Sequence, residues 1–105
     1  MLDFYKISDD IPKPDWPEKI NLERVDGLAF DEFEDLKKKG LIEERFHYWM
    51  DFRWNYQSAR KLHDLILEKY PQLREHELKI KSVNKLFNII DSTVRDNSGL
   101  IAYCD

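Results

Sequence analysis

The sequence predicts an α+β fold in which about three helices pack on one face of a small sheet. Two observations lead to this prediction. Apolar residues recur at helical spacing in three stretches of the chain, and a short apolar run typical of a buried strand occurs near each end. With 105 residues and 42% hydrophobic side chains, the chain can bury one core, so we expect a single domain over residues 1–105.

The two terminal runs are expected to be neighbouring strands. Leu2 to Ile7 is rich in aromatic and aliphatic residues, which predicts a strand buried on both faces or nearly so. Leu100 to Tyr103 follows a glycine and suits a strand beside the first, so the chain ends should lie side by side. Alternating apolar and polar residues predict another short strand over residues 20–25. Three prolines within residues 10–18 predict a surface loop before it, anchored to the core by Trp16.

The first helix is expected where acidic residues are most concentrated. Its predicted apolar stripe consists of Phe30, Phe33 and Leu36, which recur at helical spacing. Asp31 and Glu34 have the spacing of a capping box, and Gly40 is suited to the position just after the helix end. Asp31, Glu32, Glu34 and Asp35 crowd the beginning of this helix, where its dipole stabilises part of their charge. The remaining charge is expected to attract a basic partner, chiefly by raising the rate of association.

The other two helices have clear boundaries. One should begin near Asn55 or Ser58, both of which can cap a helix, and Pro71 should end it. The other should begin after Ser82 and end at residues 97–99. Its predicted apolar stripe consists of Val83, Leu86, Phe87, Ile90 and Val94.

The segment 46–56 holds six of the 14 aromatic residues. Counting by twos, one face carries Phe46, Tyr48, Met50, Phe52, Trp54 and Tyr56, which predicts an extended segment with this face in the core. A one-turn helix within the segment is the alternative. On the other face, Arg53 is expected to stack over Trp49 and to pair with Asp51, leaving a flat aromatic surface for a ligand or a partner. The structural alternative is that this cluster merely covers a sheet edge.

Composition and motifs argue against several kinds of chemistry. The three histidines lack the spacing of a metal site, and three glycines form no phosphate-binding loop, so we expect no metal and no cofactor. No nucleophile-elbow sequence is present, and the chain is not expected to be an enzyme. The net charge of −4 disfavours nucleic acid and anionic lipid as partners. A single cysteine, Cys104, and the lack of a leader or membrane-spanning run predict a soluble cytoplasmic protein.

Three stretches carry a resemblance to known sequences. Residues 1–5 (MLDFY), 46–54 (FHYWMDFRW) and 98–103 (SGLIAY) resemble a family of short uncharacterised bacterial proteins. That resemblance implies no catalytic residue. In size, acidity and expected compartment, the chain is also similar as a class to the small immunity proteins with which bacteria neutralise their own protein toxins.

The sequence therefore favours a non-catalytic, cytoplasmic protein-interaction domain, with an immunity protein as its most concrete form. In this interpretation the four carboxylates of residues 31–35 attract a basic partner, and Trp49 and Arg53 form the anchor. The alternative is a small-ligand or carbohydrate-binding module, or a minor enzyme, that uses the face of Trp49 and Arg53.

Overall fold

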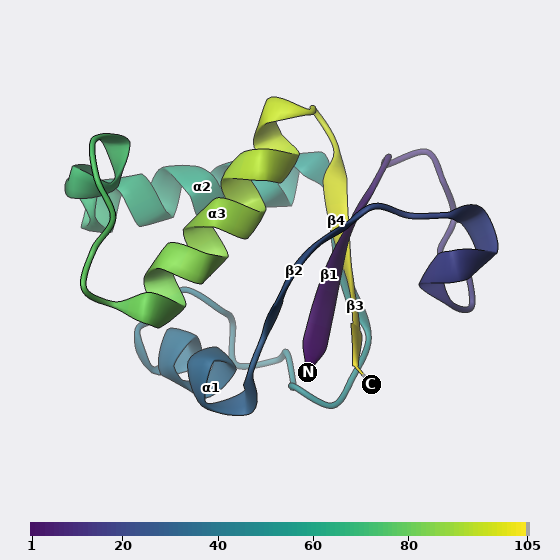
Figure 1. The fold of residues 1–105 in the computed structure, drawn as a ribbon, viewed down its shortest axis with the longest axis horizontal. Coiled ribbons are helices and arrows are strands. Elements are labelled where there is room, and N and C mark those ends of the chain that lie inside the picture. The colour runs from purple at the N-terminus through teal and green to yellow at the C-terminus, as the bar shows by residue number, and fades with distance from the viewer. Residues whose placement is uncertain (105) are drawn as a thin grey trace.

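A computed structural model describes residues 1–104 and shows three α-helices packed against a four-stranded antiparallel sheet (Figure 1). This confirms the predicted α+β class. In chain order the elements are β1 (Leu2–Ile7), a 3-10 turn η1 (Pro17–Ile20), β2 (Arg24–Leu28), α1 (Phe30–Lys38), β3 (Phe52–Trp54), α2 (Tyr56–Lys69), a second 3-10 turn η2 (Pro71–Arg74), α3 (Lys81–Arg95) and β4 (Gly99–Cys104).

The sheet has the strand order β2-β1-β4-β3, so the two terminal strands form its centre. Leu2 lies opposite Cys104 on one side and opposite Leu28 on the other. Strand β3 pairs with the outer side of β4, where Phe52 lies opposite Ala102. The beginning and the end of the described chain therefore lie side by side, as predicted.

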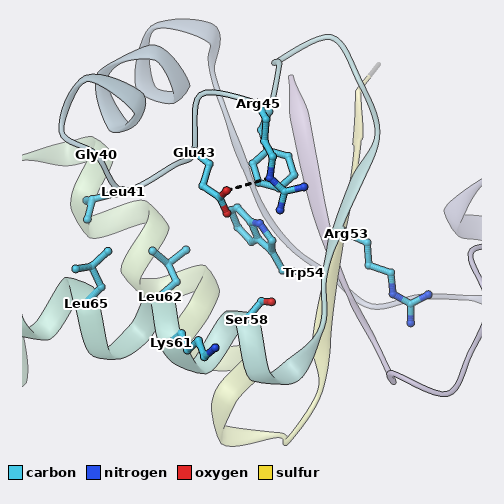
Figure 2. Close-up of a pocket in the computed structure, with 11 residues that line it drawn as sticks. Gly40, Leu41, Glu43, Arg45, Arg53, Trp54, Ser58, Lys61, Leu62 and Leu65 are labelled. Atoms are coloured by element: carbon cyan, nitrogen blue, oxygen red, sulfur yellow. Dashed lines mark hydrogen bonds and ion pairs between the residues drawn. The ribbon is translucent and has the colours of Figure 1, made fainter.

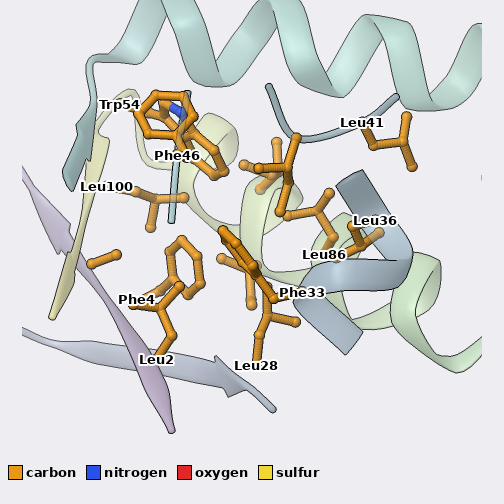
Figure 3. Packing of buried hydrophobic residues seen from close by; sticks show 14 of the residues in the cluster. Leu2, Phe4, Leu28, Phe33, Leu36, Leu41, Phe46, Trp54, Leu86 and Leu100 are labelled. Carbon is orange, nitrogen blue, oxygen red and sulfur yellow. The ribbon is translucent and has the colours of Figure 1, made fainter. Parts of the chain in front are cut away.

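The two faces of the sheet are covered differently. One face packs against the helices through a large core that includes Leu2, Phe4 and Leu100 (Figure 3). The opposite face carries a smaller cluster of Ile7, Ile101 and Tyr103 and is covered by the loop that contains η1 (Figure 1). Burial of the terminal strands on both faces follows from this arrangement, because alternate side chains enter different clusters.

The proline-rich loop is anchored by a residue other than Trp16, so that expectation was wrong. Trp16 is 53% exposed, and its ring contacts the ammonium of Lys19. The anchor is Tyr103, whose buried hydroxyl donates a 2.7 Å hydrogen bond to the carbonyl oxygen of Pro14. A phenol on a central strand can reach the loop backbone, whereas Trp16 lies beside a 3-10 turn that points outward.

The strand expected over residues 20–25 begins later than predicted. Ile20 ends the 3-10 turn η1, and Asn21 follows in the left-handed conformation with φ of 53°. The chain becomes a strand only at Arg24, whose guanidinium then donates to the carboxylate of Asp3 on β1. Pairing with β1, and not local alternation, sets where the strand starts.

Helix α1 begins and ends close to its predicted positions, but its cap differs. Ala29 is the N-cap, and its backbone N–H donates to the Oε1 atom of Glu32 at 2.9 Å. The observed pair of Ala29 and Glu32 therefore lies two residues earlier, at both positions, than the predicted pair of Asp31 and Glu34. Gly40 follows the C-cap with φ of +73°, a conformation that favours glycine, as predicted.

The boundaries of α2 confirm the prediction, whereas α3 begins at Lys81, before the predicted start after Ser82. Asn55 caps α2 by accepting a hydrogen bond from the backbone N–H of Ser58 at 2.8 Å.

Of the predicted apolar stripe of α3, Phe87 and Val94 are only partly buried. The Phe87 ring stacks on His63 of α2 with centroids 5.2 Å apart. Ile89 is fully buried instead, because the inward face of α3 is rotated away from Phe87.

Candidate functional site

The aromatic segment 46–56 is mostly a loop and not a long strand. Only Phe52–Trp54 forms a strand, while a turn over residues 47–50 is closed by a 3.2 Å hydrogen bond from Met50 N–H to His47 O. The predicted alternation survives in part, because Phe46, Tyr48, Phe52 and Trp54 are buried. Met50 departs from it and is 40% exposed, because the turn rotates its side chain outward.

The predicted cluster of Trp49, Asp51 and Arg53 does not form. The guanidinium of Arg53 donates to the carbonyl oxygen of Ser8 at 2.8 Å. Asp51 accepts from the backbone N–H of Cys104 at 3.2 Å and lies 3.6 Å from the ammonium of Lys13. Arg53 and Asp51 therefore hold the sheet edge and the proline-rich loop together. For these two residues the structure agrees with the structural alternative and not with a binding role.

Trp49 instead pairs with a residue of α1. Its ring stacks on Phe30 with centroids 6.2 Å apart and an interplanar angle of 27°, and it meets Tyr48 edge-on at 4.8 Å. Tyr48 in turn contacts Phe33 in the core at 5.9 Å. Both members of the stack remain accessible: Trp49 is 71% exposed and Phe30 is 49% exposed.

The four predicted carboxylates divide into two pairs. Asp35 accepts from Lys39 at 2.7 Å and from the hydroxyl of Ser82 at 2.5 Å, which joins α1 to α3. The hydrogen bonds from Lys39 and then Ser82 lower the pKa of Asp35 from its ordinary value. Glu32 is buried, caps α1 and accepts from Lys85 at 3.2 Å. These two carboxylates hold the fold together.

Asp31 and Glu34 are the carboxylates that remain available. Neither side chain forms a hydrogen bond or ion pair with any residue among 1–104; Asp31 is exposed and Glu34 is half-buried. Asp31 follows Phe30 directly, and Glu34 lies one turn further along the same side of α1 as Phe30. We call Phe30, Asp31, Glu34, Trp49 and Met50 the aromatic–acidic patch.

Two members of the patch were not predicted from the sequence. Phe30 was placed on the apolar stripe of the first helix, and Met50 on the buried face of residues 46–56. Phe30 is the first residue of α1, so its ring lies beyond the edge of the core and is accessible to Trp49. The sequence contained a signal for this exposure. Phe30, Phe33 and Leu36 are spaced by three residues, so in a helix with 3.6 residues per turn they do not all point in the same direction.

Residues 1–104 show neither a cluster suited to a metal ion nor a helix suited to span a membrane. They contain no group of three or more His, Cys, Asp or Glu side chains placed to hold a metal ion. None of their helices combines the length and apolarity needed to cross a membrane. His63 and Asp91, 3.0 Å apart, join α2 to α3, and the Arg95 guanidinium forms an ion pair with the same carboxylate at 2.8 Å.

The fold and the patch define a small α+β domain with an exposed aromatic–acidic surface beside the start of α1. No protein-family model, curated protein or solved structure matches the chain.

Proposed function

We propose that this protein is a non-catalytic protein-interaction domain that binds its partner through the aromatic–acidic patch. The observation that carries the proposal is the exposed stack of Trp49 on Phe30. The stack leaves large apolar surface in water, which a fold of this size could have buried, and such surface is typical of an interaction site. Tryptophan is also among the residues that contribute most to binding at protein interfaces.

The charges of the patch favour a partner with a basic surface. Asp31 and Glu34 are hydrogen-bond acceptors without partners among the described residues, and on α1 they lie next to Phe30 and one turn after it. The chain as a whole carries a net charge of −4. Lysine or arginine side chains on the partner would pair with these carboxylates, and the opposite charges would speed association.

The patch differs from the anchor predicted from the sequence. Arg53 binds the backbone of Ser8 and does not face Trp49, so it has no part in the proposed interface. Glu32 and Asp35 are likewise held within the fold and contribute little to steering. The alternative of a ligand site shared by Trp49 and Arg53 lacks support, because the Arg53 guanidinium binds the backbone of Ser8 whereas Trp49 stacks on Phe30.

An immunity protein is the most concrete form of this function. Such a protein neutralises a bacterial toxin by covering a surface, which requires complementary shape and charge and no catalysis. A small acidic domain with a rigid aromatic anchor has the properties required to cover a basic site. In this form of the proposal, the protein acts in the cytoplasm of the cell that makes the toxin.

Photo-crosslinking in the native cell tests the interface. Met50 in the patch and Ile20 on the proline-rich loop are equally accessible, at 40% and 41% exposed. Benzoylphenylalanine in place of Met50 should give one defined protein adduct, and in place of Ile20 it should not. Adducts from Ile20 alone, or the same diffuse adducts from both positions, would exclude the patch as the interface.

Identification of the cross-linked protein then tests the immunity form. Expression of that protein alone should arrest growth, and co-expression with this chain should restore it. Restoration should fail with Trp49→Ala and persist with Trp16→Ala, which removes an exposed tryptophan outside the patch. If the cross-linked partner is harmless when expressed alone, the protein is an interaction domain but not an immunity protein.

A further inference from the structure

A second concave surface lies away from the aromatic–acidic patch, between α2 and the loop that follows α1 (Figure 2). It is a groove of about 390 Å³ that is open on one side. The loop, strand β3 and helix α2 all contribute side chains to it. Its lining includes apolar side chains, among them Leu41, Trp54, Leu62 and Leu65, and polar ones, among them Ser58 and Lys61.

The floor of the groove is apolar. Leu41 and Trp54 are 4% and 8% exposed, and Leu62 and Leu65 of α2 are partly buried against the same core. Figure 2 shows these two leucines and the Trp54 indole facing the space below the loop. A cleft of a few hundred Å³ with an apolar floor and a small number of polar groups is the usual form of a small-ligand site.

The polar groups around this floor are mainly donors. The indole N–H of Trp54 has no acceptor among the described residues, and its nitrogen reaches solvent although most of the residue is buried. Lys61 and the hydroxyl of Ser58 likewise have no side-chain partner among residues 1–104. The carboxylate of Glu43 is held by Arg45 at 3.0 Å, and the Arg45 guanidinium also lies over the Phe46 ring at 4.5 Å.

The third basic residue of the lining, Arg53, does not direct its charge into the groove. Arg53 lines the groove, but its guanidinium points away from it (Figure 2) and donates to Ser8 O. The positive charge within reach of a ligand is therefore that of Lys61 and Arg45. A ligand that complements the groove needs an apolar body for the floor and an anionic acceptor for the rim.

We propose that this groove binds a small amphipathic carboxylate, with the alkyl or aryl body against Trp54, Leu62 and Leu65. The carboxylate accepts hydrogen bonds from the ammonium of Lys61 and from donors at the rim. This function is separate from the proposed protein interface, because none of the five residues of the aromatic–acidic patch lines the groove.

Titration with octanoate, followed by NMR of the full ¹⁵N-labelled chain, tests the proposal. The chain has three tryptophans, so Trp16 and Trp49 provide internal controls for Trp54. Octanoate should shift the Trp54 indole N–H resonance saturably and leave the other two unchanged. Octylammonium, with the same body and the opposite charge, should give no saturable shift.

Two charge reversals on neighbouring residues complete the test. Lys61→Glu should weaken octanoate binding by about tenfold or more, because it replaces a charge-assisted donor with a repelling carboxylate. Arg60→Glu makes the same change of charge next to it, on a residue that does not line the groove, and should alter the affinity less than about twofold. Equal weakening by both variants, equal shifts of all three indoles, or octylammonium binding as tightly as octanoate would overturn the proposal.

Discussion

The ring of Trp49, in a loop, lies against the ring of Phe30, at the start of α1, with 6.2 Å between centroids. Tyr48 braces this stack by meeting Phe30 edge-on at 5.4 Å, and Tyr48 is itself buried. Trp49 is thus both exposed and held in place by its neighbours. An anchor that is ordered before binding loses less conformational entropy when the complex forms.

The stability of two tryptophan variants should differ accordingly. Trp54→Ala should lower the free energy of unfolding by about 3 to 5 kcal/mol, because it removes a buried ring and leaves a cavity. Trp49→Ala should lower it by less than about 1 kcal/mol, because most of the ring is already in water. Urea denaturation of both variants measures the difference. A loss for Trp49→Ala as large as that for Trp54→Ala would show that Trp49 serves the fold.

Locally encoded features were the ones that the sequence predicted well. Asn55 and Gly40 mark helix ends through their own backbone preferences, and both have the predicted role. The pairing of the terminal strands could be predicted because each is a short apolar run, which is buried only if it packs against other parts of the chain. Trp16 and Phe30 were misplaced because their burial depends on where distant elements pack, and no neighbouring residue encodes this.

The candidate site was predicted in part for the same reason. Trp49 was recognised as the odd member of an alternating aromatic segment, and it is indeed exposed. Its partner Phe30 could not be identified, because the contact joins two segments separated by a loop without regular structure. Glu32 and Asp35 were indistinguishable from Asp31 and Glu34 in sequence, since only the packing of α3 decides which carboxylates meet Lys85 and Ser82.

Removal of the Tyr103 hydroxyl should loosen the proline-rich loop. Tyr103→Phe removes the 2.7 Å hydrogen bond to Pro14 and should cost about 1 kcal/mol of stability. Burial raises the pKa of Tyr103 above its ordinary 10.0, so the hydroxyl is a donor at neutral pH. Hydrogen exchange of residues 8–23 should accelerate in Tyr103→Phe and stay unchanged in Tyr56→Phe. Equal exchange in wild type and Tyr103→Phe would mean that the loop is held by other contacts.

The contribution of Asp35 to stability should depend on pH. Its folded-state pKa is lowered from 3.8 by Lys39 and Ser82, so the ionised carboxylate stabilises the fold above the unfolded pKa. That contribution is lost as the pH falls through the lower, folded-state pKa. Asp35→Asn should therefore melt at a lower temperature than wild type at about pH 7, with a gap that narrows toward about pH 3. A gap independent of pH would show that the charge of Asp35 is unimportant.

Charge reversal at the patch should mainly affect association with the partner. Asp31→Lys combined with Glu34→Lys should lower the association rate constant by about tenfold at low salt and flatten its salt dependence. The matched control is Glu18→Lys with Asp15→Lys on the proline-rich loop, which changes the net charge equally. Stopped-flow measurement of the association rate with the cross-linked partner compares the two double variants. Equal slowing by both pairs would mean that only net charge matters.

The dissociation rate of the purified complex tests the proposed interface most directly. Trp49→Ala should raise that rate by about thirtyfold or more, as expected for loss of an anchor worth at least about 2 kcal/mol, with little change in association. Trp16→Ala should leave it within about twofold of wild type. If Trp49→Ala dissociates as slowly as wild type, the aromatic–acidic patch is not the binding surface.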